Sequence, residues 1–172
     1  MPARTGTSRR WVLRLETYNR VTWLFAHRAT QDSLTRSLAR SFARSFARSF
    51  ARQVSSCNIF IKHGNVISTP PISGSILPGV TRRSVIELAR SKGYEVREEP
   101  VSIEMAMAAD EVFTTGTAVV LCAVGSLTYE GEKKQFGAPG VPTPTALELY
   151  EALTGLQQER TADEFGWVHR VC

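Results

Sequence analysis

The sequence predicts an α+β fold preceded by a basic arm. Strand-like and helix-like segments alternate from residue 57 towards the end of the chain. Among them, residues 119–124 form a continuous apolar run with too little alternation for an exposed strand, which places this run in the core of a sheet. The charge also changes sign near residue 52. About 115 residues with this apolar patterning are sufficient for a small α+β core.

The arm is the source of the positive charge. Residues 1–52 contain eleven arginines, no lysine and two acidic residues, Glu16 and Asp32, so they carry a formal charge of +9. Because the whole chain carries +5, residues 53–172 carry −4. The basic balance therefore describes the arm and not the globular part.

The arm ends in tetrapeptide repeats. Ser37-Leu38-Ala39-Arg40 is followed by three copies of Ser-Phe-Ala-Arg that end at Arg52. In a helix, a four-residue period advances by about 40° per repeat, so the arginines and the apolar residues would form parallel stripes. If helical, this segment is a basic amphipathic helix.

Three interpretations of the arm stay open. Its arginine-rich, serine-rich and acid-poor composition is typical of a transit peptide for a chloroplast or mitochondrion. Tandem tetrapeptides also arise when a short nucleotide repeat expands, which would leave a helical or disordered tail without function. A third interpretation is an arm that binds nucleic acid or a membrane surface. Nucleic-acid binding is disfavoured because no pattern of a nucleic-acid-binding fold accompanies the arm. The apolar stretches of the arm are too short to span a bilayer.

A hairpin and a helix are predicted to open the globular part. Residues 57–62 alternate as a strand, residues 63–65 form a turn, and residues 66–69 return as the partner strand. Residues 81–92 have the apolar spacing of an amphipathic helix, and Gly93 stands where a C-terminal cap is expected.

Shorter elements follow. Residues 94–99 alternate as an exposed edge strand, which Pro100 ends. Ser102 caps a short predicted helix that reaches Ala109. Residues 111–115 form a strand that leads into Gly116-Thr117-Ala118.

The last part of the chain is predicted to hold a second hairpin and a helix. Residues 127–129 and 130–136 pair with each other, and residues 137–144 form an ordered but irregular loop. Residues 145–158 form a helix with a core-facing stripe. The apolar positions of this stripe are Leu147, Leu149, Tyr150, Leu153 and Leu156.

The start of the helix at residues 81–92 is suited to an anion. Pro78 and Gly79 set a tight turn, and Val80 and Thr81 open the helix. Its first N–H groups have no partner within the helix, and the helix dipole is positive there. These residues therefore suit a phosphate, although an ordinary capped helix has the same local pattern.

Four ordered motifs carry a family resemblance. They are Val54-Ser-Ser-Cys-Asn58-Ile-Phe60, Val66-Ile-Ser-Thr-Pro70, Leu77-Pro-Gly-Val-Thr-Arg82 and Ala109-Asp-Glu-Val-Phe-Thr-Thr-Gly-Thr-Ala118. With Phe165-Gly166-Trp167 near the end, they make the chain from about residue 54 onward similar to the branched-chain amino acid aminotransferases. These are fold-type IV enzymes that use pyridoxal 5'-phosphate. The resemblance covers roughly the last two-thirds of this chain and the second half of the family's chain.

The resemblance implies a fold and a domain division. Residues 54–172 would be part of the family's large domain, a short mixed sheet with packed helices, and residues 1–53 would be the arm. The family's reaction moves an amino group between leucine, isoleucine or valine and 2-oxoglutarate. A homodimer, or a dimer with a complete relative, is the implied assembly, and a chloroplast or mitochondrion is the expected location, with the cytoplasm as the alternative.

The resemblance also assigns site residues. The cofactor phosphate would lie against Gly79, the N–H groups of Val80 and Thr81, and the side chains of Thr81 and Thr117, with Leu77 against the cofactor ring. The N–H groups of Thr117 and Ala118 would receive the α-carboxylate of the substrate. A plainer interpretation is that Thr81 caps a helix and Gly116 turns a strand.

Two residues that the family uses for chemistry are absent from the sequence. The family's cofactor-anchoring lysine precedes the Asn58 motif, but the only lysines here, Lys62, Lys92, Lys133 and Lys134, follow it. The family's glutamate for the pyridine nitrogen is replaced by Gln53, which cannot supply a negative charge. We therefore expect cofactor binding that is at best non-covalent, no catalytic residue in this chain, and impaired activity.

Other functions remain as alternatives. The chain would then be a non-catalytic interaction module that dimerises with a complete relative, or an inert gene remnant, or a targeting or RNA-binding protein that uses its arm. Three cysteines without a Cys-x-x-Cys pair, together with isolated histidines, argue against a disulfide framework and a metal site.

Overall fold

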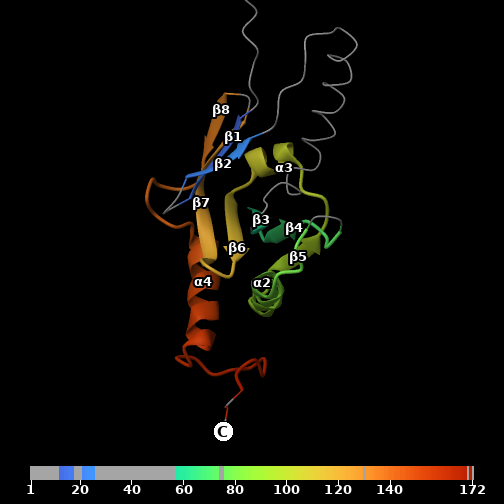
Figure 1. Cartoon of the computed structure of the whole chain (residues 1–172), viewed down its shortest axis with the longest axis vertical. Helices are drawn as coiled ribbons and strands as arrows, with labels where there is room; N and C mark the ends of the chain where they lie inside the picture. The colour runs from blue at the N-terminus through green and yellow to red at the C-terminus, as the bar shows by residue number, and fades with distance from the viewer. Residues whose placement is uncertain are drawn as a thin grey trace, which may run out of the picture.

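The computed structural model describes residues 12–17, 21–25, 57–73, 76–129, 131–169 and 171, the first two ranges as backbone only (Figure 1). The Ser-Phe-Ala-Arg repeats and Gln53 lie outside the described residues. The described part is an α+β structure built on a mixed sheet, as the sequence predicts.

The sheet has eight strands in the order β2-β1-β7-β6-β3-β4-β5, and β8 pairs with β7 beside this path. The strands are β1 (Val12–Thr17), β2 (Val21–Phe25), β3 (Asn58–His63), β4 (Val66–Thr69), β5 (Glu95–Glu98), β6 (Glu111–Gly116), β7 (Val120–Tyr129) and β8 (Glu132–Gln135). The helices are α2 (Val80–Ser91), α3 (Ile103–Ala108) and α4 (Pro144–Gln157).

The first predicted hairpin is confirmed. Strands β3 and β4 pair antiparallel, with Ile61 opposite Ser68 and His63 opposite Val66. The turn contains Gly64 at a φ of +54°, a left-handed conformation that glycine adopts at little cost. The Asp110 carboxylate accepts a hydrogen bond from the Gly64 N–H at 2.7 Å and ties this turn to the start of β6.

Helix α2 joins the two parallel strands of the sheet, β4 and β5. It ends as predicted at Gly93, whose φ is +86°. The Gly93 N–H donates to the Arg90 carbonyl and the Tyr94 N–H donates to the Ala89 carbonyl, which is the pair of bonds that defines a Schellman motif. Strand β5 is the exposed edge that the alternation of residues 94–99 predicts.

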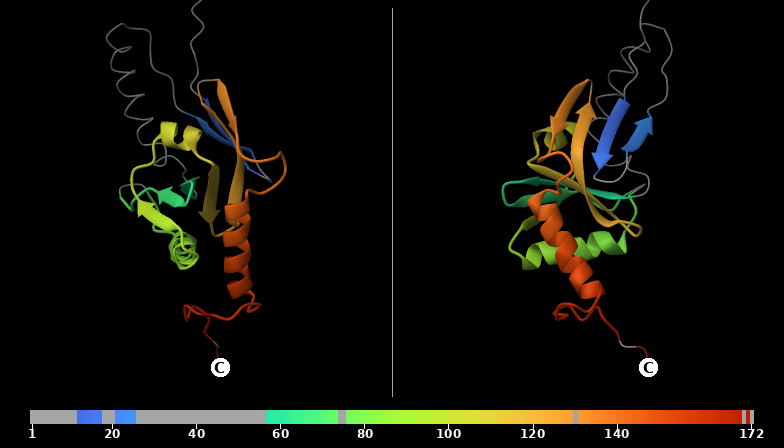
Figure 2. Two further views of the ribbon diagram at one scale, coloured as in Figure 1. Left: turned by 180° about the vertical axis from the view of Figure 1, so that it is seen from behind. Right: turned by 90° about the vertical axis from the view of Figure 1, so that its left-hand side faces the viewer.

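Two hydrophobic cores cover the two faces of the sheet. Ile59, Ile61 and Val112 point to the face that is covered by α3. Phe60 and Phe113 point to the opposite face, and their rings stack with centroids 5.1 Å apart. Helices α2 and α4 pack on this face (Figure 2). Because adjacent residues of one strand serve opposite cores, β3 and β6 are buried on both sides.

The strand after β6 is longer than the sequence predicts. Residues 120–129 form one strand, β7, whose first half pairs with β6 and whose second half pairs with β8. The predicted second hairpin is therefore confirmed, but its first strand is the continuation of the apolar run. The two predicted segments merge because Gly125 and Ser126 stay extended and pairing continues past them.

Two positions of the predicted stripe on α4 are wrong. Leu149, Leu153 and Leu156 are buried against the sheet, but Leu147 and Tyr150 are 41% and 40% exposed. At 100° per residue, Leu147 lies about 160° and Tyr150 about 100° around the helix from Leu149. The apolar stripe of α4 is narrower than the composition of the helix indicates.

Strands β1 and β2 lie within the residues that the sequence assigns to the arm. They pair antiparallel with each other, and β1 pairs with β7 from Arg14 opposite Thr128 to Thr17 opposite Val124. This pairing extends the sheet beyond β7.

Candidate functional site

The start of α2 presents backbone N–H groups that the helix does not use. The first bond of the helix runs from the Arg83 N–H to the Gly79 carbonyl at 3.1 Å, so the N–H groups of Val80, Thr81 and Arg82 precede any helical partner. No side chain caps this end of the helix. Several unpaired donors at the positive end of a helix dipole form a favourable place for an anion.

Asn58 holds the loop that leads into α2. It is the first residue of β3, it is 7% exposed, and its Nδ2 donates to the Leu77 carbonyl at 2.9 Å. The backbone of Asn58 is also paired with Thr115 of β6. One residue therefore connects the loop before α2 to the end of β6.

The end of β6 supplies the second half of the candidate site. Gly116 closes the strand, residues 117–119 turn, and Val120 begins β7 opposite Gly116. Thr115 is fully buried, and its Oγ1 has no hydrogen-bond partner. An unpartnered buried hydroxyl is unfavourable, so Thr115 marks a polar position inside this end of the sheet.

The structure brings the predicted site residues to one end of the β3–β6 pair. Leu77 and Val80 are 68% and 82% exposed, and Thr117 and Ala118 are exposed on the β6–β7 turn. Thr81 is half-buried. The residues predicted to bind phosphate and those predicted to bind carboxylate thus lie mainly on two loops. Asn58 connects these loops, because it bonds Leu77 and is paired with Thr115 near the end of β6.

The two arginines that follow Thr81 do not serve as anion ligands. Arg82 is 3% exposed, and its Nη2 donates to the Pro70 carbonyl and to Glu98 Oε2, each at 2.8 Å. Arg83 pairs with Glu87 on the outer face of the helix. Among the described residues, the positive character at the start of α2 therefore comes from backbone N–H groups, since Glu98 and Glu87 hold Arg82 and Arg83.

The lysines of the chain are far from the candidate site. Lys62 lies four residues from Asn58 along β3, which is about 13 Å of strand, and its Nζ pairs with Glu111 at 3.4 Å. Lys92, which follows the last residue of α2, pairs with Glu148. Lys133 and Lys134 belong to β8. In the part of the chain that the structure describes, the N–H groups at the start of α2 would suit the phosphate of pyridoxal 5'-phosphate, whereas the four lysines lie away from this end of the β3–β6 pair.

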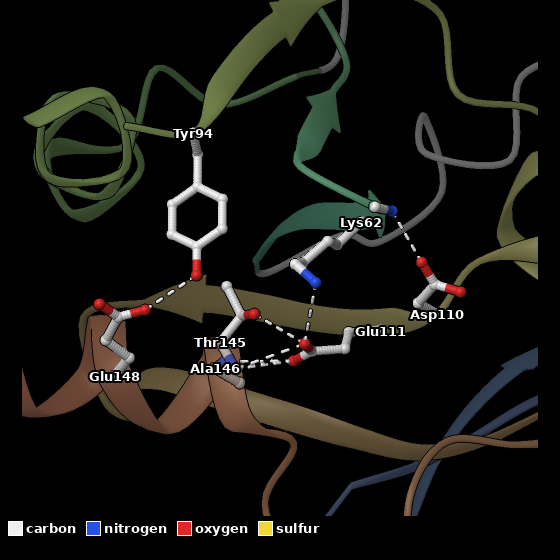
Figure 3. A network of polar contacts seen from close by, with 8 residues as sticks. Lys62, Tyr94, Asp110, Glu111, Thr145, Ala146 and Glu148 are labelled. Atoms are coloured by element: carbon white, nitrogen blue, oxygen red, sulfur yellow. Dashed lines mark hydrogen bonds and ion pairs between the residues drawn. The ribbon is translucent and has the colours of Figure 1, made fainter. Parts of the chain in front are cut away.

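Asp110-Glu111 has the structural role that its position between helix and strand indicates. Glu111 is 6% exposed and accepts hydrogen bonds from the Thr145 N–H at 3.0 Å and the Thr145 hydroxyl at 2.7 Å (Figure 3). Burial alone would raise the pKa of this carboxyl, but the bonds from Thr145 and the charge of Lys62 lower it below its usual value. Glu111 thus caps α4 from strand β6. It is the first residue of β6, whereas the candidate site lies at the last residue, Gly116.

Sulfur and metal chemistry find no support among the described residues. Cys57 and Cys122 are both free, and burial raises the pKa of the Cys57 thiol, which disfavours the reactive thiolate. Histidine, cysteine and acidic side chains form no metal-binding group within these ranges. No helix in the same part of the chain has the length and apolar content needed to cross a membrane.

Asn58 and Thr115 are the candidates for the site that sequence reasoning did not assign, and the inward position of Arg82 was not predicted either. Asn58 reaches a carbonyl 19 residues away, and Arg82 reaches Glu98 16 residues away, so neither contact has a local sequence signal. Asn58 stands in a motif that the family resemblance uses, and this is the one indication that it matters.

Comparison with known proteins identifies relatives of this chain. Residues 53–127 match the family model "Amino-transferase class IV". The chain is 52% identical over 115 residues to branched-chain-amino-acid aminotransferase 5, chloroplastic, of Arabidopsis thaliana. That match covers 67% of this chain and 28% of the relative, so the chain spans under a third of that protein's length.

Solved structures give the same result. The Escherichia coli branched-chain amino acid aminotransferase aligns with a TM-score of 0.58 and 37% identity, covering 67% of this chain and 36% of that one. The branched-chain amino acid aminotransferase of T.th., solved with pyridoxamine 5'-phosphate, aligns with a TM-score of 0.57 and 32% identity, covering 66% and 36%. From its motifs, its fold and these matches, the globular part of the chain belongs to the class IV aminotransferases, within the branched-chain amino acid aminotransferase group.

Proposed function

We propose that this chain binds the phosphate group of pyridoxal 5'-phosphate as the phosphate-holding part of a branched-chain aminotransferase site. The observation that carries the proposal is the set of unpaired N–H groups at Val80 and Thr81, placed beside the β6–β7 turn by Asn58. The Thr81 and Thr117 hydroxyls complete the phosphate ligands, and Leu77 offers an exposed apolar surface to the cofactor ring.

The substrate side of the site follows from the same turn. The N–H groups of Thr117 and Ala118 would orient the α-carboxylate of a branched-chain amino acid or its 2-oxo acid. The bound cofactor supplies an electron sink for amino transfer between such substrates and 2-oxoglutarate. What the residues of this chain contribute is binding and orientation, because an exposed turn can present two adjacent N–H donors to one carboxylate.

Proton transfer needs a group that the described residues do not place at the site. The four lysines are paired or lie on β8, and Gln53 is neutral. We therefore propose non-covalent cofactor binding by this chain, and amino transfer only where a complete relative in a dimer supplies the lysine. We also propose an organellar location, in keeping with the chloroplastic name of the Arabidopsis relative.

A comparison of two ligands tests the proposal. The purified chain should bind pyridoxal 5'-phosphate at least tenfold more tightly than pyridoxal, because only the first carries the phosphate. Thr81→Ala should reduce that preference, whereas Thr161→Ala, at an exposed position after α4, should leave it unchanged. Equal affinity for the two ligands would refute the proposal.

Covalent chemistry is tested separately. The absorbance of the chain with pyridoxal 5'-phosphate is recorded before and after borohydride reduction, and mass spectrometry locates any retained cofactor. We expect free-aldehyde absorbance and no specific site of retention. Stoichiometric retention on one lysine would show that this residue has taken over the anchor, and transamination would then be expected.

A further inference from the structure

The side-chain amide of Asn58 is hydrogen-bonded to the loop before α2. Its Nδ2 donates to the Leu77 carbonyl at 2.9 Å, and the Gly79 N–H donates to the same carbonyl at 2.8 Å. The side chain is buried, and the backbone of Asn58 is fixed by its pairing with Thr115. Asn58 therefore joins a rigid strand to a loop that has no strand partner of its own.

The other end of the same amide touches Gly79. A Cβ atom at Gly79 would lie 2.5 Å from Asn58 Oδ1, which is too close for any pair of such atoms. The φ and ψ of Gly79, −65° and 134°, are values that any residue adopts. A side chain at position 79 would therefore displace the Asn58 amide, so glycine is favoured there for space and not for conformation.

The position of this loop sets the direction of the N–H groups at the start of α2. Gly79 is the residue before the helix, and its carbonyl accepts the first helical bond from Arg83. Any movement of Gly79 rotates the N–H groups of Val80 and Thr81, which must converge on one phosphate. Ligand geometry of this kind has to be held within about 0.5 Å.

From these contacts we infer that Asn58 is a positioning residue, which fixes the Leu77–Gly79 turn against the sheet and thereby aims the Val80 and Thr81 N–H groups at the phosphate. This inference rests on the proposed function, because it assigns the residue that pre-forms the proposed phosphate site. Asn58 itself does not contact the ligand in this assignment. Asn58 affects phosphate binding only by holding the Leu77–Gly79 turn in place.

The test is a double-mutant cycle of Asn58→Ala, Gly79→Ala and the double variant. The readout is the ratio of dissociation constants for pyridoxal and pyridoxal 5'-phosphate, which isolates binding of the phosphate. Each single variant should lower this ratio about tenfold, since in each a Val80 or Thr81 N–H group no longer points at the charged phosphate. The double variant should lose no more than either single one, because both remove the same contact.

A matched control separates positioning from loss of stability. Thr145→Val also removes one buried hydrogen bond, from the Thr145 hydroxyl to Glu111, at the opposite end of β6. It should lower the unfolding free energy by an amount similar to Asn58→Ala but leave the phosphate ratio unchanged. An equal fall of the ratio in Thr145→Val would overturn the inference, since the effect would then be one of general stability.

Amide hydrogen exchange gives a second readout that needs no ligand. In Asn58→Ala, the Gly79 and Arg83 amides should exchange at least tenfold faster than in the native chain, while Thr145→Val leaves them protected. If the native chain shows no phosphate preference, the proposed function fails and the exchange data alone decide on Asn58. If the preference is present but Asn58→Ala keeps both the ratio and the protection, the inference fails and the proposed function stands.

Discussion

Glu111 shows how one buried side chain can replace a missing helix cap. Thr143 stands at the N-cap position of α4 but makes no side-chain capping bond, and Pro144 follows it. The carboxylate of Glu111, from strand β6, instead accepts bonds from the first turn of the helix. A negative charge at this end of a helix is also favoured by the helix dipole. The carboxylate therefore links the helix to the sheet as well as capping it.

Replacing Glu111 with glutamine should destabilise the fold. The neutral amide keeps the shape of the side chain but loses the charge-assisted bonds to Thr145 and the ion pair with Lys62. We expect the unfolding free energy to fall by about 2 kcal/mol, measured by urea denaturation at neutral pH. Glu104→Gln, at an exposed position on α3, is the control and should change the unfolding free energy little.

The same carboxylate predicts a pH dependence of stability. Although burial opposes its ionisation, the Thr145 bonds and Lys62 leave the folded-state pKa of Glu111 below its unfolded value. The contribution of Glu111 is thus complete above the unfolded pKa and is lost as the pH falls through the folded pKa. Unfolding curves measured from neutral to acidic pH should show the native chain and Glu111→Gln converging. A difference that stays constant in acid would contradict this origin.

At the scale of elements, the end of α2 depends on one residue. Gly93 has a φ of +86°, and no atom lies within 4 Å of the position where a Cβ would stand. A substitution there meets no steric clash, so the fall in unfolding free energy that it causes measures the strain of the backbone conformation alone. The two bonds of the Schellman motif connect α2 directly to Tyr94 and to the start of β5.

Gly93→Ala should lower the unfolding free energy by about 1 kcal/mol, because an L-residue with a Cβ is strained at positive φ. Gly93→Asn should cost less, since asparagine tolerates this conformation. Thermal unfolding followed by circular dichroism compares the two variants. An alanine variant as stable as the native chain would mean that the turn relaxes without cost.

The elements also show what sequence reasoning could reach. The β3–β4 hairpin, α2, β5 and α3 were predictable because their turns, caps and apolar periods lie within a few residues of each other. The bond between Ser102 Oγ and the Met105 N–H, at 3.2 Å, is such a local signal. Strands β1 and β2 were not predicted as strands, because their composition is that of the basic arm and their partner β7 is more than 100 residues away.

The candidate site was predictable only in part. Leu77, Gly79, Val80, Thr81, Thr117 and Ala118 came from motifs that the family resemblance identifies, and the structure places them at one end of the sheet. The inward position of Arg82 and the contact of Asn58 with Leu77 were not predictable, since both depend on how distant segments pack. The roles of the phosphate and carboxylate ligands remain predictions for the binding experiments.

At the scale of the whole molecule, strand β1 covers one edge of β7. Strand β1 covers β7 at residues 124–128, which include the buried residues Val124 and Leu127. Without β1, this strand would expose unpaired backbone groups beside an apolar core. Exposed edges of this kind pair with other chains.

Deletion of residues 1–25 should therefore increase self-association, seen as a higher mass in analytical ultracentrifugation. Deletion of residues 1–11 is the matched control, because it removes charge but keeps β1 and β2. We expect the shorter deletion to behave like the native chain. If both deletions associate equally, the charge of the arm and not the strand edge keeps the chains apart.

The continuity of β4, α2 and β5 has a consequence for the order of folding. These elements follow one another between residues 66 and 98, and β4 pairs in parallel with β5, so part of the packing around α2 is between neighbours in the sequence. The pairing of β1 with β7 instead has to close a loop of about a hundred residues, and the entropy of loop closure grows with length. We therefore expect the β4–α2–β5 segment to form early and the far edge of the sheet to close last. During synthesis, the β4–α2–β5 segment would leave the ribosome before β7 does.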